Sequence, residues 1–397
     1  MKKIYLNRAK TQIARPNTIR NINRQIVLNY FRDCSPISRA AIAKETTLNR
    51  SSVSTIVEAL HMQGLIEEIG MGNSSGGRKP TLLKLKTGKP VALGVDITPR
   101  ITTIAVADMG GKILENEDFA TVADITEMTA AIIEKVSRFV NLFKKNKLEI
   151  GISVPGITDY MTGNVLYVPY FQWRDWNISR ILAEKTNLNV IIENDANAIA
   201  LAEMWFGEKK IREIKNFITV LVSEGIGTGI IFDGEIYRGE KGAAGEFGHM
   251  IVGENAPVLC SCGSRNCWEA LASEKAAIAR YNLLLPKNDC RQLTNIDELI
   301  DNARRGEQNA LRALRETGRF LGIGISNLIV GLSPQAVIVS GGIVRAWDII
   351  SDELNTMASR SVRNGLSDTY LTTSTLGVRP ALIGAVNLVL ARKFALA

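Results

Sequence analysis

The chain has 397 residues, of which 46% are hydrophobic and 22% are charged, and its formal net charge is +8. This length exceeds one ordinary hydrophobic core, so two or three domains are expected, and the composition is typical of a soluble globular protein. No hydrophobic run is long enough to cross a bilayer, and the start Met1-Lys-Lys-Ile lacks an apolar signal segment, which argues against a membrane role and predicts a reducing, cytoplasmic setting.

The positive charge is concentrated in the first quarter of the chain. Residues 1–90 carry 16 Lys and Arg against 5 Asp and Glu, a net charge of +11, whereas residues 91–397 carry 32 against 35, a net charge of −3. Such an asymmetry indicates an N-terminal segment that meets a polyanion such as nucleic acid. A solvated basic surface is the alternative, so the pattern inside the segment must decide between them.

Three helices are predicted in this basic segment. Residues 17–32 place their apolar and aromatic side chains on one face, and Ser38 is a good N-cap for a second helix that runs to Thr46. A tight turn follows at residues 47–49. The third helix is predicted from about Arg50 to Gln63, because Val53, Ile56, Val57 and Leu60 recur at helical spacing and Gly64 supplies a stop.

The outer face of the third predicted helix is small, polar and basic. It carries Arg50, Ser51, Ser52, Ser54 and Thr55. A short helix, a turn and a helix with such an N-terminal face are typical of a helix-turn-helix, in which that face enters the major groove of DNA. These five residues are therefore expected to contact DNA.

Two strands around a basic tip are predicted next. Residues 65–69 and 81–86 have strand-like patterns on either side of the glycine-rich segment 70–80. Such a wing would bring Arg78 and Lys79 to phosphates or into a narrow, A·T-rich minor groove. A three-helix module that docks on another protein is the alternative, but the charge, the hydroxyl-bearing face and the basic wing together favour DNA.

From residue 90 onward, apolar strands alternate with helices. Strands are predicted at 91–96, 101–108, 150–156, 190–195, 217–223 and 336–342, with a hairpin at 230–239 and helices at 124–144 and 305–332. The strand that ends at Asn194 and Asp195 would present both side chains at its carboxyl edge, where open α/β sheets bind ligands. Two α/β lobes around a cleft are the inferred architecture.

One of the two histidines and three of the five cysteines fall within nineteen positions. They are His249, Cys260, Cys262 and Cys267. Three thiolates and one imidazole can close tetrahedrally on Zn²⁺ and leave no open coordination position, so the metal would be structural. A disulfide pair plus a free thiol is the alternative, and the reducing compartment expected for this chain favours zinc.

Four motifs together resemble the ROK family of sugar kinases and sugar-responsive repressors. They are Glu193-Asn194-Asp195-Ala-Asn197-Ala, Gly225-Ile-Gly227-x-Gly229, Gly242-Ala-Ala-Gly-Glu246-Phe-Gly-His249 and Cys260-x-Cys262-Gly-x-x-x-Cys267-Trp-Glu269. The resemblance covers nearly the whole chain. A winged helix-turn-helix ahead of such a body resembles the repressor branch, and the cysteine motif plus Trp173-Arg174-Asp175 is most similar to xylose-operon repressors.

The resemblance implies an α/β fold in which a winged helix-turn-helix precedes a two-lobed body like that of the actin-like ATPases. The expected domains are residues 1–88 for DNA binding, 89–200 for the first lobe, completed by 380–397, and 201–379 for the second lobe with the zinc site and the oligomerisation surface. Family members are usually dimers or tetramers, so either assembly is expected here.

The resemblance also implies a sugar site. In the family, residues at the positions of Asn194, Asp195, Glu246, His249 and Glu269 hold the sugar hydroxyls. Polyhydroxyl ligands do need several fixed polar groups that converge in a cleft. His249 would serve twice, with one ring nitrogen on zinc and the other on a hydroxyl. Each carboxylate alone is also compatible with a surface charge; together, beside a metal-stiffened loop, they predict a site.

Asp195 lies where the ROK kinases keep their catalytic base, but both segments that resemble phosphate loops are altered. The first, Asp-x-Gly-x-Thr in the kinases, reads Asp96-Ile-Thr98-Pro99-Arg100, in which Pro99 lacks an amide donor. The second, Gly-Thr-Gly-Ile-Gly, reads Ser223-Glu224-Gly-Ile-Gly, and its carboxylate would repel phosphates by about 1 kcal/mol per charge pair at ~4 Å in water and about 4 kcal/mol when partly buried. ATP and Mg²⁺ are therefore not expected as cofactors, although Arg100 offers partial compensation.

The segment before Trp173 also departs from the family. The kinases carry Pro-Asn-Leu-Gly-Trp, whereas this chain has Pro169-Tyr170-Phe171-Gln172-Trp173. Because this segment shapes the sugar pocket in the family, the identity of the sugar is left open. Either aromatic residue could stack on a pyranose face, and buried packing is the commoner role for such residues.

The sequence thus predicts a cytoplasmic repressor of carbohydrate genes, with xylose or a related sugar as effector and a palindromic, A·T-rich operator as its DNA partner. Sugar binding would favour the state that does not bind DNA. Two alternatives stay open: an ATP-dependent sugar kinase with a DNA-binding head, and a ligand-free repressor whose cleft is vestigial.

Overall fold

The computed structural model describes residues 16–73, 79–286, 289–360 and 368–394 and divides into two compact units. The first comprises residues 1–89, 108–112 and 392–397, and the second comprises residues 90–107 and 113–391. Among the described residues, no helix is both long and apolar enough to cross a membrane.

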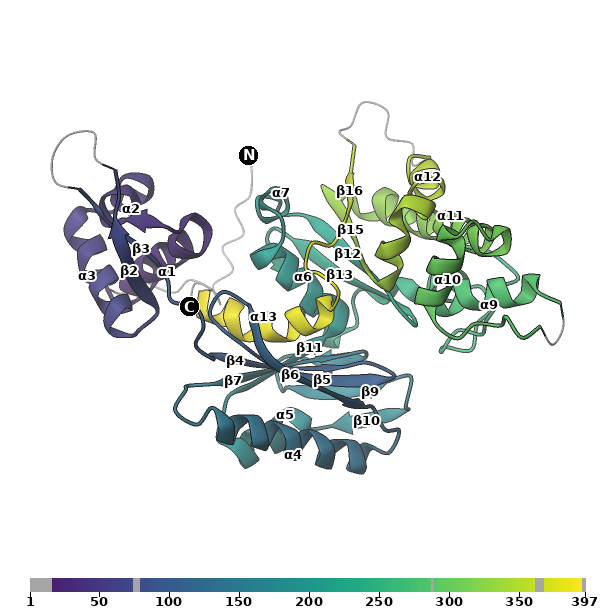
Figure 1. Ribbon diagram of the computed structural model, residues 1–397, viewed down its shortest axis with the longest axis horizontal. Helices are drawn as coiled ribbons and strands as arrows, with labels where there is room; N and C mark the ends of the chain where they lie inside the picture. The colour runs from purple at the N-terminus through teal and green to yellow at the C-terminus, as the bar shows by residue number, and fades with distance from the viewer. Residues whose placement is uncertain (1–15, 74–78, 287–288, 361–367, 395–397) are drawn as a thin grey trace, which may run out of the picture. The chain divides into compact units, whose positions relative to one another are not determined.

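The described part of the first unit contains three helices and a small three-stranded sheet (Figure 1). Its elements are α1 (Pro16–Cys34), β1 (Ile37–Ser38), α2 (Arg39–Thr46), α3 (Arg50–Met62), β2 (Ile66–Met71) and β3 (Thr81–Leu85), with sheet order β1-β3-β2. Ser38 caps α2 by accepting from the Ala41 amide, and Asn49 caps α3 by accepting from the Ser52 amide. The predicted helices and strands of this segment are confirmed.

A common apolar core holds the first unit together. Val53, Val57 and Leu60 of α3 and Phe31 of α1 are fully buried, as the helical spacing predicts. The last turn of the C-terminal helix also belongs to this unit. Its Phe394 is fully buried and accepts a hydrogen bond through its carbonyl from the Asn29 side chain at 3.2 Å.

The second unit contains two five-stranded sheets of related topology. The first, in the order β11-β7-β4-β5-β6, is built from β4 (Ala92–Ile97), β5 (Ile101–Ala107), β6 (Ile113–Ala120), β7 (Glu149–Val154) and β11 (Val190–Asn194). The second, in the order β14-β13-β12-β15-β16, is built from β12 (Phe217–Val222), β13 (Ile226–Phe232), β14 (Glu235–Ile236), β15 (Ala336–Gly341) and β16 (Tyr370–Thr373). In each, the central strand pairs antiparallel on one side and parallel on the other.

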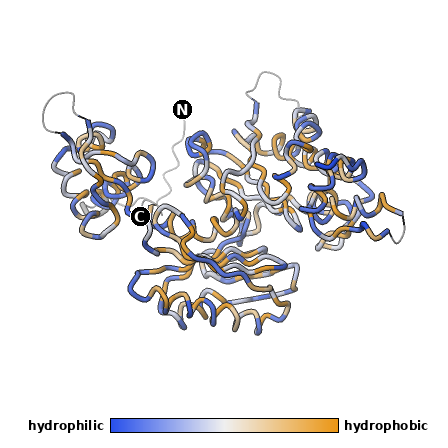
Figure 2. Tube along the Cα trace, in the orientation of Figure 1, coloured by the Kyte–Doolittle hydropathy of each residue, from blue (hydrophilic) through white to orange (hydrophobic). Residues whose placement is uncertain are grey.

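Helices cover both faces of the first sheet. Figure 1 shows α4 (Ile125–Leu142) and α5 (Ile178–Thr186) on one face and α13 (Pro380–Phe394) on the other. Gly94 and Gly151 let α13 approach closely, because a methyl group on either would collide with Val386 or Ala385. Figure 2 shows many hydrophobic residues in the middle of this sheet, as expected for the strands β4, β5 and β7, which are buried on both sides, whereas the edge strand β6 is largely exposed.

The helices of the second half are α6 (Asp195–Phe206), α7 (Lys209–Arg212), α8 (Trp268–Ala272), α9 (Glu274–Leu284), α10 (Ile296–Arg304), α11 (Gln308–Leu332) and α12 (Trp347–Ala358). Short 3₁₀ turns accompany them at η1 (Glu240–Gly242), η2 (Glu246–His249) and η3 (Gly342–Ala346). The long helix predicted at 305–332 is confirmed as α11. Its Leu314, Leu321 and Ile325 are buried in the same core as Val220 and Val337 of the sheet.

The glycine-rich segment 225–229 differs from expectation. The sequence predicted a hairpin that begins at residue 230, whereas β13 already begins at Ile226 and pairs with β12 along its length. Gly227 and Gly229 lie within this strand, and a methyl group on Gly229 would collide with Ala196 and Ala200 of α6. These two glycines therefore serve the close packing of a helix on a strand.

A small antiparallel sheet was not predicted. It consists of β8 (Ile157–Asp159), β9 (Asn164–Val168) and β10 (Trp173–Trp176), in the order β10-β9-β8. The strands are short, and polar residues and glycines separate them, so the sequence pattern alone gave no clear period. The turn between β9 and β10 carries the Pro169-Tyr170-Phe171-Gln172 segment.

The packing of Trp268 against Gly324 generates a test of the fold. Trp268 is fully buried, and a methyl group at Gly324 of α11 would overlap its indole ring. Gly324→Ala should therefore destabilise the protein by about 1–3 kcal/mol, measured by urea unfolding. Gly331→Ala, on the same helix with nothing within 4 Å of the added methyl, is the control and should be neutral or stabilising by up to about 1 kcal/mol. Equal effects of the two substitutions would contradict the packing argument.

Candidate ligand cleft and metal centre

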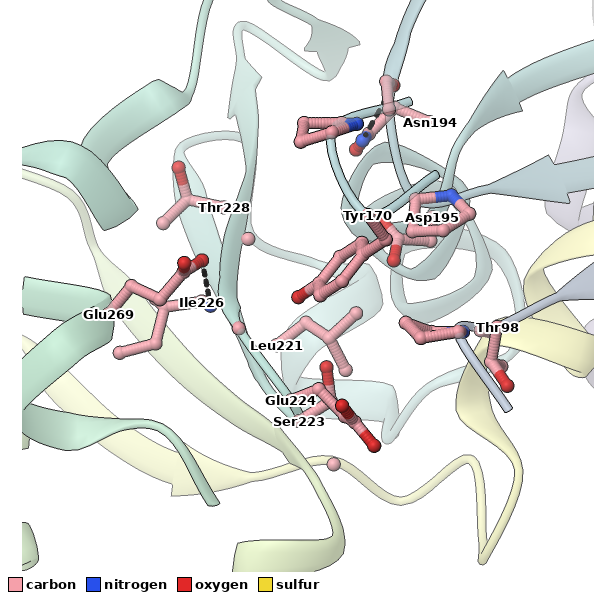
Figure 3. A pocket seen from close by; sticks show the side chains of 18 of the residues that line it. Thr98, Tyr170, Asn194, Asp195, Leu221, Ser223, Glu224, Ile226, Thr228 and Glu269 are labelled. Carbon is pink, nitrogen blue, oxygen red and sulfur yellow. Dashed lines mark hydrogen bonds between the residues drawn. The ribbon is translucent and has the colours of Figure 1, made fainter. Parts of the chain in front are cut away.

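A cleft of about 600 Å³ opens within the second unit. Its walls come from the ends of β4, β7 and β11, from the turn between β12 and β13, and from the segment around η2. All five residues predicted to hold a sugar line this cleft: Asn194, Asp195, Glu246, His249 and Glu269. Figure 3 shows Asn194, Asp195 and Glu269 around it.

Asn194 and Asp195 lie where β11 ends and α6 begins. Asn194 caps α6 by accepting from the Asn197 amide at 3.1 Å, and its side-chain amide donates to the Gly156 carbonyl at 3.1 Å. Asp195 accepts from the Ala196 amide at 2.8 Å. Burial raises the pKa of Asp195 to about 7, and the nearby Glu246 contributes in the same direction. This carboxyl can therefore donate to or accept from a hydroxyl near neutral pH.

A buried ion pair between Glu193 and Arg238 fixes the end of β11 that carries Asn194. The sequence pattern did not predict this pair. Glu193 is 2% exposed and accepts from Arg238 Nε at 2.8 Å and from Asn197 Nδ2 at 3.2 Å. Its other contacts include the Asn194 amide at 3.1 Å. Because Arg238 follows β14 and Glu193 belongs to β11, the pair ties the two sheets together behind Asn194. The one available signal was a charged residue in the apolar strand Val-Ile-Ile-Glu.

The four predicted metal ligands converge. The side-chain ligand atoms of His249, Cys260, Cys262 and Cys267 all lie within 4.8 Å of one another. His249 Nδ1 is 3.2 Å from Cys260 Sγ, and the Sγ atoms of Cys262 and Cys267 are 3.4 Å apart. All three cysteines are free thiols, so the alternative of a disulfide does not apply to this structure. Three thiolates and an imidazole in such a cluster fit a tetrahedral metal ion.

The metal-ligand cluster and the cleft share side chains. His249 turns Nδ1 toward Cys260, while its Nε2 is 3.6 Å from the Glu246 carboxylate. Glu269, two residues after Cys267, accepts from the Ser261 hydroxyl at 3.2 Å and, through its other oxygen, from the Ile226 amide at 3.3 Å. The dashed line between Glu269 and Ile226 in Figure 3 marks the second of these hydrogen bonds. A group bound at the cysteines would thus hold the backbone that carries two of the cleft's polar side chains.

The two segments that resemble phosphate loops in sequence line another part of the same cleft. Thr98, Pro99, Arg100, Ser223 and Glu224 all border it. Arg100 Nε donates to Glu224 and forms an ion pair with it across the two sheets' edges. Asp96 lies behind them, and burial, followed by the charge of Asp195, raises its pKa to about 7.

The two aromatic residues before Trp173, Tyr170 and Phe171, have different surroundings. Tyr170 lines the cleft, whereas Phe171 stacks on Trp173 with ring centroids 4.5 Å apart and packs against the core of the first sheet. Of the two roles left open for these aromatic residues, Phe171 therefore has the packing role, and Tyr170 is the one that borders the cleft.

The first unit presents most of the predicted DNA contacts on one helix. On α3, Arg50, Ser51, Ser54 and Thr55 are exposed and Ser52 is partly buried. Lys79, two residues before β3, is exposed. Arg78 lies outside the described residues. The exposed side chains begin at the N-terminus of α3, opposite Val53 and Val57 in the core.

Comparisons with known proteins cover nearly the whole chain. Residues 92–392 match the model of the ROK family. The chain is 33% identical over 383 residues to the xylose repressor of Bacillus spizizenii, covering 95% of this chain and 97% of that protein.

Solved structures share the fold. A ROK family transcriptional regulator, described as a homologue of the E. coli MLC protein, aligns with a TM-score of 0.77 and 24% identity over 95% of this chain and 97% of that chain. A ROK family glucokinase from Streptomyces griseus, in complex with glucose and AMPPNP, aligns with a TM-score of 0.66 and 28% identity over 75% of this chain and 98% of that chain. The family model and the 33% identity over almost the full length show that this chain belongs to the ROK family.

Proposed function

We propose that this protein, a sugar-responsive transcriptional repressor, controls genes for the use of xylose or a related sugar. The observation that carries the proposal is that one chain joins an exposed basic and hydroxyl-bearing helix to a cleft lined by Asn194, Asp195, Glu246, His249 and Glu269. The similarity to a xylose repressor along both parts supports the same conclusion.

In this proposal residues 1–88 bind DNA, residues 89–200 with 380–397 form a first lobe, and residues 201–379 form a second lobe. Asn194 and Asp195 hold sugar hydroxyls from the first lobe, and Glu246, His249 and Glu269 hold them from the second. A ligand held from both sides favours one arrangement of the lobes, which is the differential affinity that a switch requires. The protein acts as a dimer or tetramer on a palindromic, A·T-rich operator.

The cysteine cluster is proposed to hold structural Zn²⁺. The ligands would be His249, Cys260, Cys262 and Cys267, and the metal would act by fixing the segment that ends at Glu269. Because four protein ligands leave no open position, the ion supplies geometry to the sugar site.

A kinase activity is the competing proposal, since Asp195 occupies the place of a catalytic base. Two features of the cleft speak against it. Pro99 removes an amide donor from the first phosphate segment, and the Glu224 carboxylate, paired with Arg100, occupies the second. We therefore propose that ATP and Mg²⁺ are not cofactors of this protein.

The sugar site predicts a ligand-dependent change in stability and DNA binding. Xylose at about 100 times its Kd should stabilise the protein by about 2.7 kcal/mol and release operator DNA. Asp195→Asn, which keeps the shape and removes the charge, should lose most of this response, whereas Asp352→Asn on the exposed surface of α12 should keep it. Thermal unfolding and fluorescence anisotropy with labelled operator measure the two effects.

Two outcomes would contradict this proposal. Operator binding that no sugar of a broad panel alters would favour a vestigial cleft. Turnover of ATP with a sugar at ordinary enzyme rates would favour the kinase.

The metal proposal predicts a linked loss of metal and sugar response. Cys260→Ser should release zinc, measured by atomic emission, and should weaken sugar binding by about ten- to a hundredfold, because the segment that carries Glu269 loses its anchor. Cys290→Ser, at an exposed cysteine outside the cluster, is the control and should change neither. A zinc-free variant with an unchanged sugar Kd would separate the metal from the sugar site.

The DNA-binding proposal predicts a change in salt dependence. The double variant Arg50→Ala and Lys79→Ala should bind operator more weakly, and the slope of log K against log salt concentration should become shallower by about 0.9 for each phosphate that the protein no longer neutralises. Lys185→Ala, on the exposed end of α5, removes a positive charge away from the first unit and is the control. An unchanged slope in the double variant would refute the assignment of these two residues.

A further inference from the structure

Tyr170 projects from the turn between β9 and β10 into the cleft. The residue is 37% exposed, and Figure 3 shows its hydroxyl directed toward the side where Ile226 and Glu269 lie. A methyl group at Gly225 would collide with both the Tyr170 hydroxyl and the Glu269 carboxylate, so these two groups lie near the same point of the cleft wall. Tyr170 therefore stands beside a residue proposed to bind the sugar.

A second cavity of about 210 Å³ also borders this tyrosine. Its lining includes Val258, Leu259 and Lys275, none of which borders the main cleft. Five residues line both cavities and so form part of the partition between them: Pro169, Tyr170, Glu224, Ser261 and Glu269. This side cavity has room for a substituent of several non-hydrogen atoms, and Tyr170 contributes the bulkiest side chain of these five residues.

The turn holds Tyr170 in place. Gln172, at φ 57°, donates from its side-chain amide to the Pro169 carbonyl at 2.8 Å and accepts from the Tyr167 hydroxyl at 3.0 Å. At the next position after Tyr170, Phe171 is stacked on the buried Trp173, which itself donates to the Ala123 carbonyl at 2.6 Å. With its neighbours fixed in this way, the Tyr170 backbone cannot shift to admit a larger ligand without breaking these contacts.

The Tyr170 hydroxyl shares its part of the cleft wall with the Glu269 carboxylate, since both groups lie near Gly225. The charges of Asp195 and Glu224 act on the pKa of Tyr170 in the same direction as that of Glu269. Burial, followed by the charge of Glu269, raises the pKa of this phenol, so the hydroxyl stays protonated. A protonated phenol at the cleft wall can donate a hydrogen bond to a bound sugar.

We propose that Tyr170 sets the size of the sugar that the cleft accepts, by closing the side cavity to any bulky substituent next to the hydroxyl held by Glu269. The favoured ligand is a small pyranose such as a pentose, to which the Tyr170 hydroxyl donates a hydrogen bond. Pyranoses with an acetamido group at that edge are rejected. This inference rests on the proposed function, namely that the cleft binds a sugar.

The experiment compares sugar affinities of the full-length, zinc-loaded protein and two variants by isothermal titration calorimetry with xylose, glucose and N-acetylglucosamine. Tyr170→Asn, which introduces the smaller residue found in the ROK kinases, opens the partition. It should bind N-acetylglucosamine at least about tenfold more tightly than the wild type does, since a group of this size in a pocket is worth tenfold or more. Tyr170→Phe keeps the partition and removes the hydroxyl, so it should bind xylose more weakly and still reject N-acetylglucosamine.

The outcomes separate this inference from the proposed function. A wild type that binds none of the sugars overturns the proposed function itself. A wild type that binds xylose, together with a folded, zinc-loaded Tyr170→Asn that gains no affinity for either larger sugar, overturns only the role of Tyr170. Equal affinity of the wild type for xylose and N-acetylglucosamine also overturns it. Thermal unfolding without sugar and zinc content establish that each variant is folded.

Discussion

The cleft depends on how the segment between η2 and α8 is held. Apart from η2 and one isolated bridge between Ile251 and Cys267, this stretch has no regular secondary structure to fix it. Two sets of side-chain contacts hold this segment in place of strand or helix hydrogen bonds. The convergent thiols and imidazole can be closed by one metal ion, and Trp268 is buried in the notch at Gly324 of α11 with its indole nitrogen donating to the Phe320 carbonyl at 3.0 Å. Since Glu269 follows Trp268 directly, both the ligand cluster and the packing of Trp268 determine where the Glu269 carboxylate lies in the cleft.

The buried carboxyl groups of the cleft indicate whether the cleft binds a ligand. Burial raises the pKa of Asp96 and Asp195 to about 7 each, and the charge of Asp195 contributes to the shift of Asp96. Asp96 Oδ1 also has no hydrogen-bond partner in the described structure. Buried polar groups without partners cost stability, and an apolar core of the same volume would be more stable. A chain that keeps such groups around a cavity of about 600 Å³ is better explained by a polar ligand than by a vestigial cleft.

Local pattern predicted much of the fold, and contacts between distant segments account for what it missed. The helices α1 and α3 have clear helical spacing, and α2 and α3 have N-caps, so the ends of all three were predicted to within about two residues. The convergence of His249 with the three cysteines was predictable because ligand type and spacing carry the information. By contrast, the pairing of Glu193 with Arg238 and the packing of Gly229 on α6 join residues far apart in sequence with no shared periodicity. The same reason explains why the sequence could not tell which of Tyr170 and Phe171 faces the cleft.

The polar side chains that line the two parts of the cleft have different hydrogen-bond and ion-pair partners. Where a kinase would need backbone amides around phosphates, Arg100 and Glu224 pair with each other, so the charge that would recognise phosphate is already neutralised. Where a sugar would bind, the polar groups of Asn194, Asp195 and Glu269 are held by backbone amides and a carbonyl, and each keeps further capacity for a ligand. Tyr170 stands beside this second half and near the Glu224 carboxylate as well. A cleft that gathers such groups on one side and pairs Arg100 with Glu224 on the other suits the detection of a ligand by binding.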